Sequence, residues 1–395
     1  MFQRTEYKTL KERIEEPRRF IQVVMGPRQV GKSTMVKQVL TDSHIPYMLF
    51  TADAVPASNT TWISECWATV RRKMKVDGAK EYLLVIDEVQ KVNSWSEMVK
   101  KEWDSDTFSD TNIKVVLLGS SRVLLDSGLA DSLMGRFERI VMQHWSYPEM
   151  RDAFGFSIEQ YVYFGAYPGG APLISDERRW LDYVAGSIID ATINKDILQG
   201  KKVMKPALLR QTFELASAYS GQELSFTKIL GQLQDAGNVT TLASYLTLLD
   251  DAGLVRTLDK YSVDKARKRN SVPKYQVYNN ALRNIYCGAS FNDAIIDSKL
   301  WGRLFESAIG AHIINCEKAG YYKTHYWRDS KNREVDYVLE KNGQLLALEV
   351  KSNTDNTNQG LVEFRNQYKN VQTFVVGEGG IPAEDFLRIN PADLF

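Results

Sequence analysis

The feature that most constrains this chain is a short apolar run that ends at a glycine-rich loop. Residues 20–25 read FIQVVM, and the sequence GPRQVGKST follows directly at 26–34. A run that is apolar throughout is typical of a central strand in a parallel sheet that is covered on both faces. The loop fits the pattern G-x-x-x-x-G-K-[ST], in which backbone N–H groups surround phosphate oxygens. The sequence therefore predicts an α/β domain that binds a nucleotide.

Individual positions of this loop suit a triphosphate and its metal ion. Gly26 and Gly31 let the backbone turn tightly, Lys32 is placed to reach the β- and γ-phosphates, and Ser33 offers its hydroxyl to Mg²⁺. The helix expected over 32–40 adds its positive end to the anion site. The predicted nucleotide-binding residues of the loop are Gly26, Pro27, Arg28, Gln29, Val30, Gly31, Lys32, Ser33 and Thr34. The alternative is a glycine-rich turn that holds no nucleotide.

A second buried strand, YLLVIDE at 82–88, ends in two acids. Asp87 suits the role of holding the Mg²⁺ hydration shell beside Ser33. Glu88 follows at the position where a carboxylate accepts a proton from the attacking water. A solvated acidic loop is the alternative interpretation of the pair.

A third strand, KVVLLGSS at 114–121, ends in Ser120 and Ser121. The carboxyl ends of parallel strands meet at the ligand crevice, so one hydroxyl, assigned to Ser120, is predicted to sense the γ-phosphate or to position the water. Two hydroxyls that only cap the next helix are the alternative.

Six segments together carry a resemblance: GPRQVGKST, IDEVQ, GSSR, SLMGRF at 132–137, SYPEM at 146–150 and FGAYPGG at 164–170. They resemble bacterial and archaeal AAA-type ATPases whose AAA domain precedes a C-terminal region of unassigned function. The resemblance implies an ATP-binding AAA fold, with Arg136 near the γ-phosphate of its own or a neighbouring subunit of a homo-oligomer. An arginine there would neutralise charge in the transition state. The family usually has Gly-Gly-Tyr-Pro where this chain has GAYP at 165–168, interpreted as a minor packing change.

The middle of the chain changes to a helical pattern. Three apolar-periodic helices are stopped by glycines, and two short strands around a polar loop follow. Three helices and a hairpin predict a winged-helix domain, a relative of the helix-turn-helix. The segments are PALLRQTFELASAYSG, SFTKILGQLQDAG, VTTLASYLTLLDDAG, LVRTLDKYS and KYQVYNN.

Two parts of this domain give opposite indications about nucleic acid. The candidate recognition helix, 239–251, has no Lys or Arg and ends in two aspartates, which disfavours an approach to phosphates. The loop between Lys260 and Lys274 instead carries six basic residues against Asp264, a net charge of +5. We predict non-specific DNA binding there, with a solvated loop or a subunit contact as the alternatives. The predicted contacts are Lys265, Arg267, Lys268 and Arg269.

Near the C-terminus, REVDYVLEKNGQLLALEVKS predicts a hairpin that turns at Asn342-Gly343. That register places Asp336 opposite Glu349 and Glu334 opposite Lys351, with all four side chains on one face. The other face carries apolar side chains for the core: Val335, Tyr337, Leu339, Leu346, Leu348 and Val350. Because opposed like charges are destabilising, the register suggests a cation between the two carboxylates.

Asp, a spacer and Glu-x-Lys resemble the PD-(D/E)XK nuclease superfamily, although no proline precedes Asp336. The resemblance implies that Asp336 and Glu349 bind a metal ion, that Lys351 is the catalytic lysine, and that Glu306 supplies the acid of the first helix. The alternative is a surface hairpin in which Glu334 pairs with Lys351, worth under ~1 kcal/mol.

Length and composition set the outer limits. A chain of 395 residues with 44% hydrophobic and 25% charged residues is an ordinary globular protein of two or three domains. A net charge of +1 excludes a basic field over the whole molecule, and no apolar run reaches the ~20 residues that span a bilayer. The first residues lack a secretory signal, and three widely spaced cysteines indicate free thiols in the cytoplasm.

The expected architecture is α/β: a P-loop AAA+ parallel-sheet domain, then a winged-helix domain and an α/β nuclease-like domain. The predicted boundaries are 1–155 for the ATPase domain, 156–204 for a helical brace, 205–285 for the winged helix and 286–395 for the nuclease-like domain. The leading hypothesis is an ATPase that uses ATP and Mg²⁺ and is coupled to nucleic-acid handling, with no membrane partner. The alternative is a nucleotide-gated interaction switch whose nuclease-like domain is inactive.

Overall fold

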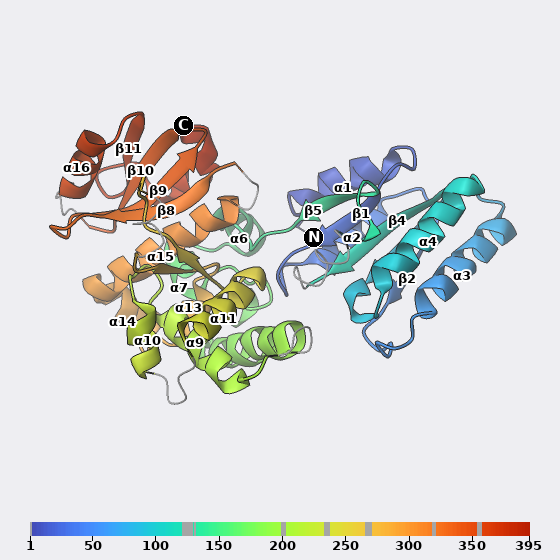
Figure 1. Ribbon diagram of the computed structural model, residues 1–395, viewed down its shortest axis with the longest axis horizontal. Coiled ribbons are helices and arrows are strands. Elements are labelled where there is room, and N and C mark those ends of the chain that lie inside the picture. Colours follow the sequence, from blue (N-terminus) through green and yellow to red (C-terminus); the bar gives the residue numbers. More distant parts are fainter. Residues whose placement is uncertain are drawn as a thin grey trace. The chain divides into compact units, whose positions relative to one another are not determined.

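A computed structural model describes residues 2–120, 129, 132–198, 203–232, 238–264, 271–317, 321–353 and 358–395. The chain divides into two compact units, Met1–Gln143 and His144–Phe395 (Figure 1). Both combine helices with sheets, which confirms the predicted α/β class. Cys66, Cys287 and Cys316 are free thiols, as expected. Among the helices within these ranges, none is both long and apolar enough to cross a bilayer.

The first unit is built on a parallel sheet of order β2-β3-β4-β1-β5. Its strands are β1 (Ile21–Met25), β2 (Tyr47–Thr51), β3 (Tyr82–Asp87), β4 (Ile113–Gly119) and β5 (Phe137–Val141). β1 lies between β4 and β5 and is buried along its whole length. The three apolar runs expected to be buried strands are therefore β1, β3 and β4, and their carboxyl ends share one edge.

Helices cover both faces of this sheet (Figure 1). They are α1 (Glu6–Glu15), α2 (Lys32–Thr41), α3 (Trp62–Asp77), the 3-10 turn η1 (Val89–Lys91) and α4 (Trp95–Phe108). Trp67, Trp95 and Trp103 of α3 and α4 pack against alternate residues of the buried strands. Burying side chains of this size contributes roughly 1.5–3 kcal/mol each. This packing holds the sheet that carries the loop between β1 and α2 at the carboxyl ends of its strands.

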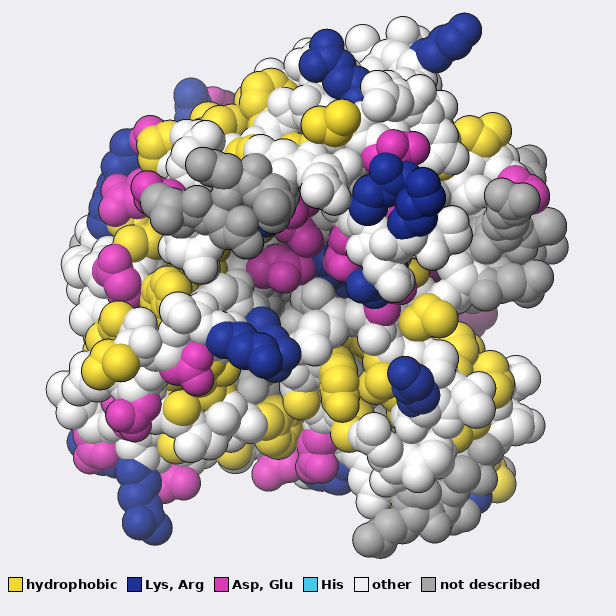
Figure 2. All heavy atoms as spheres, turned by 90° about the vertical axis from the view of Figure 1, so that its left-hand side faces the viewer, with side chains coloured by type: hydrophobic (Ala, Val, Ile, Leu, Met, Phe, Trp, Pro, Cys, Tyr) yellow, Lys and Arg dark blue, Asp and Glu magenta, His cyan; other side chains and the backbone are white. Residues whose placement is uncertain are grey.

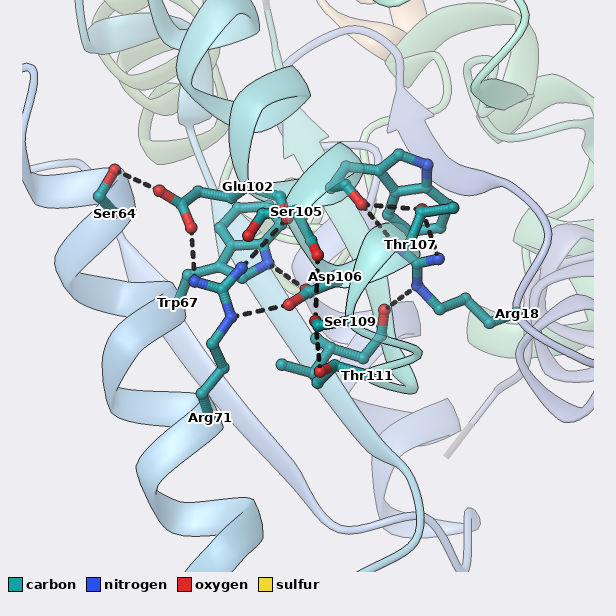
Figure 3. Close-up of polar contacts among 12 residues, drawn as sticks. Arg18, Ser64, Trp67, Arg71, Glu102, Ser105, Asp106, Thr107, Ser109 and Thr111 are labelled. Carbon is teal, nitrogen blue, oxygen red and sulfur yellow. Dashed lines mark hydrogen bonds and ion pairs between the residues drawn. The ribbon is translucent and has the colours of Figure 1, made fainter.

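A buried polar cluster joins α3 to α4 at the side of this core (Figure 3). Asp106 is fully buried and accepts hydrogen bonds from Trp67 Nε1 at 2.9 Å and Arg71 Nε at 2.7 Å. Arg71 also donates from Nη1 to Glu102 Oε2 at 2.6 Å. Trp103 lies on the same helix, α4, and the guanidinium of Arg18, which precedes β1, lies 3.5 Å from its ring centroid. Buried charges need such partners, so the cluster sets the spacing of the two helices.

The second unit begins with helices that brace its interior. They are α6 (Tyr147–Phe154), α7 (Ile158–Phe164), η2 (Ala171–Leu173), α8 (Glu177–Asp182) and the π-helical segments η3 (Tyr183–Asp190) and η4 (Thr192–Leu198). Gly165 has φ +70°, and a Cβ there would lie 2.2 Å from Asn279 Oδ1. The same Asn279 oxygen accepts a hydrogen bond from the backbone N–H of Ala166. The glycine of the FGAYPGG segment is thus required by a close approach of the chain.

Three helices and a strand pair follow in the predicted order. They are α9 (Pro206–Ala218), α10 (Phe226–Gln232), α11 (Val239–Asp251), β6 (Val255–Leu258) and β7 (Lys274–Val277). β6 and β7 are antiparallel, and Ser220 and Glu223 add isolated bridges to β7. Helices α13 (Ala281–Asn284), α14 (Phe291–Ile296) and α15 (Ser298–Glu317) continue the chain. Assignment of this segment as a winged-helix domain stays a prediction that its element order fits.

The C-terminal sheet has the order β11-β10-β9-β8. Its elements are β8 (Lys323–Arg328), β9 (Glu334–Lys341), β10 (Gln344–Lys351), α16 (Gln359–Gln367), β11 (Val371–Gly377), α17 (Ala383–Phe386) and η5 (Pro391–Leu394). The predicted hairpin is confirmed: Leu348 pairs with Tyr337, and Asn342 and Gly343 have φ +51° and +80°. Two successive positive φ values are what a two-residue hairpin turn requires.

One detail of the predicted hairpin is wrong. The pairing of β8 with β9 shifts between His325 and Trp327, which marks a bulge and breaks the strict alternation along β9. Val335 consequently packs with Phe364 of α16, whereas the Tyr337 hydroxyl donates to Gln276 Oε1 on β7. The expected single apolar face is therefore divided between α16 on one side and α15 with β7 on the other.

Candidate nucleotide-binding and acidic sites

The loop between β1 and α2 is held in a conformation that depends on its glycines. Gly26 has φ +154°, and a Cβ there would lie 2.1 Å from the carbonyl oxygen of Met142. Gly31 has φ +93° and precedes the first turn of α2. The buried Arg4 donates to the Val30 carbonyl at 2.7 Å and supports the loop from α1's side. Sequence analysis missed Arg4, because nothing in its local pattern separates it from the other N-terminal charges.

Lys32 folds over the loop that it follows. Its Nζ donates to the carbonyl oxygens of Gly26 at 2.8 Å and Pro27 at 2.7 Å. The side chain is buried, with 7% of its surface exposed. An ammonium in this position lies at the mouth of the N–H-lined loop, where phosphate oxygens would compete for it. Its predicted role of reaching the β- and γ-phosphates stays a prediction.

Ser33 and Asp87 come together at the edge of the sheet. The Ser33 hydroxyl donates to Asp87 Oδ2 at 2.9 Å, while Asp87 Oδ1 accepts from the backbone N–H of Glu88 at 2.9 Å. A hydroxyl and a carboxylate oxygen side by side are the donor set that Mg²⁺ takes beside a nucleotide. The two residues predicted to share the metal ion are therefore adjacent.

Glu88 lies next to this pair, in a left-handed backbone conformation with φ +54°. Its Oε2 accepts hydrogen bonds from Gln90 Nε2 at 2.7 Å and from Ser120 Oγ at 3.2 Å. The expected convergence of Ser120 with the acids is thus found in the structure, at the ends of β3 and β4. Gln90 was missed, although the IDEVQ segment that contains it was noted.

Arg136 lies at the other end of the sheet. Its carbonyl accepts a hydrogen bond from Ile21 N, at the start of β1, whereas Gly26 follows the end of that strand. Five strand residues span about 16 Å. The guanidinium pairs with Asp104 of α4 through Nε at 2.8 Å and Nη2 at 3.0 Å. Within one chain, then, Arg136 is not beside the loop, and its predicted role on a neighbouring subunit stays a prediction.

Comparison with known proteins agrees with this geometry. Residues 18–151 match an AAA domain. The first unit therefore contains an AAA domain. A solved structure, a Walker-type ATPase of Pyrococcus abyssi, has the same fold, with a TM-score of 0.50 and 15% identity, covering 73% of this chain and 96% of that one. Residues 155–293 and 301–385 match two domains of unknown function, DUF8612 and DUF4143.

Relatives extend over almost the whole chain. An uncharacterised protein of Haemophilus influenzae is 24% identical over 376 residues, which covers 89% of this chain and 88% of the relative. An uncharacterised protein of Mycobacterium tuberculosis is 22% identical, with coverage of 94% and 80%. An archaeal relative from Methanocaldococcus jannaschii is 18% identical, with coverage of 89% and 79%. The AAA domain and the region that follows it are therefore both covered by the similarity to these relatives.

The acidic cluster of the second unit contains a cation that sequence analysis had placed elsewhere. Lys274, predicted to lie in the basic loop, is fully buried at the start of β7. Its Nζ lies 2.7 Å from Glu306 Oε1, 3.5 Å from Glu334 Oε1 and 3.9 Å from Asp336 Oδ1. It also lies 4.8 Å from the ring centroid of Tyr337. The predicted strand segment KYQVYNN begins with this lysine, but the charge count assigned it to the loop.

Charge and burial act against each other in this cluster. Burial lowers the pKa of Lys274, but Glu306 and the neighbouring acids outweigh it and hold that pKa well above its usual range. Burial and the negative charge of Glu306 raise the pKa of Asp336 well above its usual value. Figure 2 shows the side on which α14 and α16 lie in Figure 1, with acidic side chains gathered in a central hollow. The cluster is thus a largely buried group in which each charge depends on the others.

The remaining residues of the predicted nuclease site lie close by. Lys351 pairs with Glu349 at 3.1 Å, and Glu334 pairs with Lys274 and with Arg328 at 3.7 Å. The structure thus gives Glu334 and Lys351 these other partners, and the surface pair of Glu334 with Lys351 stays an alternative. Burial raises the pKa of Glu349, against the lowering effect of Lys351.

Metal and nucleic-acid ligands receive less support. Across the ranges given above, no group of three or more His, Cys, Asp or Glu side chains is arranged to hold a metal ion. A metal site made of Glu306, Asp336 and Glu349 therefore stays a prediction. The four predicted nucleic-acid contacts, Lys265, Arg267, Lys268 and Arg269, lie outside the described residues.

Proposed function

We propose that this chain binds ATP with Mg²⁺ and hydrolyses it at the carboxyl edge of the parallel sheet. One contact carries the proposal: the hydrogen bond of 2.9 Å that joins Ser33, in the first turn of α2, to Asp87, at the end of β3. Two motifs 54 residues apart meet at this bond, at the mouth of a loop whose N–H groups suit phosphate oxygens.

Each residue of this edge has a distinct part in the proposed reaction. Lys32 exchanges its two carbonyl partners for phosphate oxygens when nucleotide binds. Ser33 and Asp87 fit a magnesium ion, which supplies charge neutralisation at the phosphates when it is bound. Glu88 accepts the proton of the attacking water, and Ser120 with Gln90 fixes the direction of its carboxylate.

The test is nucleotide binding by calorimetry, with ATP and GTP, to the intact chain and to Lys32→Ala. Loss of the ammonium should weaken ATP binding by about 10- to 150-fold, since a charge-assisted contact contributes about 1.5–3 kcal/mol. Lys37→Ala is the matched control, because Lys37 is exposed on the same helix. Absence of binding by the intact, folded chain, or equal binding by Lys32→Ala, would refute the proposal.

We propose that the second unit binds a protein partner and that the nucleotide state of the first unit controls this binding. On this proposal the second unit does not cleave nucleic acid with a metal ion. The observation that favours this output is the ammonium of Lys274 among the carboxylates that a nuclease would use for its metal ion. Helix α11 carries no Lys or Arg, so it offers no cation to a phosphate backbone.

A cleavage assay distinguishes partner binding from nuclease activity. It uses plasmid and single-stranded DNA with Mg²⁺ or Mn²⁺, with and without ATP. The interaction proposal expects no cleavage under any of these conditions. Cleavage by the intact chain that Asp336→Ala abolishes would instead establish the nuclease. DNA binding is a separate question: reversing the charges of Arg267, Lys268 and Arg269 should weaken it, and an unchanged affinity at low salt would exclude the basic loop as the contact.

A further inference from the structure

The ammonium of Lys274 joins three parts of the second unit. It comes from β7, and it contacts Glu306 on α15 and Glu334 and Asp336 on β9. Nζ also donates to the backbone carbonyl of Asp336 at 3.2 Å. The side chain is fully buried, so its charge is neutralised by these groups and not by water. Its acidic neighbours are therefore committed to a cation that the chain itself provides.

The same carboxylates do not fit a divalent cation in this arrangement. Mg²⁺ needs several oxygens at about 2.0–2.1 Å in octahedral geometry. Here Asp336 Oδ2 accepts from the backbone N–H of Val350 at 2.8 Å, and the nearest Glu306 oxygen is bonded to the ammonium. A divalent cation placed between Glu306 and Asp336 would also lie within a few ångströms of a buried positive charge, in a medium that screens it poorly.

We propose that Lys274 takes the place of a catalytic metal ion in the second unit. The three carboxylates and this ammonium form an ion-paired joint that ties β7 to α15 and β9. The C-terminal sheet then works as a metal-independent module, and movement of the strand pair β6–β7 is transmitted to it through the joint. The proposal is independent of the ATP hydrolysis proposed for the first unit.

The decisive measurement is the number of Mn²⁺ ions bound, counted by electron paramagnetic resonance. The protein carries Ser33→Ala and Asp87→Asn as its background, so that the nucleotide site contributes no bound ion. This parent should hold no Mn²⁺, and Lys274→Met should hold one, which Asp336→Asn then removes. Removal of the ammonium leaves the carboxylates free to take a cation in its place.

Two results would overturn the proposal. One is a Mn²⁺ ion bound by the parent and lost in Asp336→Asn, because the carboxylates would then hold metal beside Lys274. Another is a folded Lys274→Met protein that binds no Mn²⁺, because the lysine would not be what excludes it. The parent and its Asp336→Asn variant decide the question even where Lys274→Met does not fold.

Thermal unfolding gives an independent reading. Lys274→Met should lower the Tm of the second unit by on the order of 10 °C, because it leaves uncompensated buried charge. Adding Glu306→Gln should restore part of that loss, since it removes one of the unpaired carboxylates. Lys323→Met is the matched control, as Lys323 is exposed on β8. An equal fall in Tm for Lys323→Met, or no recovery with Glu306→Gln, would contradict an ion-paired joint.

Discussion

The Ser33 hydroxyl donates a hydrogen bond of 2.9 Å to the carboxylate of Asp87. Ser33 occupies the first turn of α2, and Asp87 ends β3, two strands away from β1 in the sheet. The bond therefore closes the edge of the sheet between the loop and the second acidic motif. It places the oxygens that suit a magnesium ion next to each other, which would reduce the reorganisation that the proposed nucleotide binding requires.

Glu88→Gln should separate nucleotide binding from hydrolysis. The amide keeps the size of the side chain but cannot accept the proton of the attacking water, so turnover should fall by about 10²–10⁴-fold. ATP binding should stay within about two-fold, because the phosphates are held by other groups. Phosphate release and calorimetry measure the two quantities separately.

The control for that substitution is Glu97→Gln on α4, where the side chain is exposed. It should leave both binding and turnover unchanged. Normal turnover in Glu88→Gln would remove Glu88 from the role of general base. In that event Ser120 and Gln90, which hold its carboxylate, would also lose their proposed function.

Much of this edge could be predicted because its signals are local. The loop motif lies between a fully apolar strand and a helix start, and Asp87 ends another such strand, so their meeting follows from parallel topology alone. The hairpin register followed in the same way from Asn342-Gly343. Local pattern could not locate Arg136. Whether a loop residue lies at the amino ends or at the carboxyl ends of the strands depends on how the whole sheet is connected.

Arg136 should act as a brace within one chain. Both it and Asp104 expose 33% of their side chains, so removal of either should lower the free energy of unfolding by only about 0.5–1 kcal/mol. Arg136→Ala and Asp104→Asn should therefore have equal effects in urea unfolding.

We also expect an equimolar mixture of Arg136→Ala and Lys32→Ala to hydrolyse ATP at the sum of the separate rates.

A mixture that exceeds that sum would assign Arg136 to a neighbouring subunit. In such a mixture the Lys32→Ala chain would supply its arginine to a partner with an intact loop. That result would confirm the role that the AAA-type resemblance implies, and it would also establish a homo-oligomer as the active form.

Asp106→Asn should destabilise the first unit. The buried carboxylate accepts from both Trp67 and Arg71, and burial raises its pKa (Figure 3). An amide oxygen accepts less strongly from Arg71 and its N–H₂ finds no acceptor there, so the free energy of unfolding should fall by about 1–3 kcal/mol. Asp77→Asn on α3, which removes an exposed pair with Lys73, should cost under ~0.5 kcal/mol. Equal costs for the two variants in urea unfolding would exclude the cluster as a determinant of stability.

The lysine of the acidic cluster shows where sequence patterns stop being informative. Lys274 is close in sequence to a run of basic residues, and charge counting placed it with them. In the fold it begins β7, and its partners Glu306 and Glu334 come 32 and 60 positions later. Which of several nearby lysines points inward depends on the packing of β7 against α15, and no local period records that contact.

The contribution of His312 to the stability of the second unit should fall as the solution is acidified from pH 7 to pH 4. Its Nε2 donates to the Ile389 carbonyl at 3.0 Å, and burial lowers its pKa to about 4. Below pH ~6.5 the unfolded chain takes up a proton that the folded state refuses, so the free energy of unfolding falls by about 1.4 kcal/mol per pH unit, to a total of about 3 kcal/mol near pH 4. Urea unfolding of the wild type and of His312→Gln at each pH gives this contribution as the difference between the two proteins. The control is His44→Gln, at an exposed position, which should show the same pH dependence as the wild type. An imidazole of His312 that titrates near pH 6.5 by NMR would show that the folded state accepts the proton and would exclude this origin.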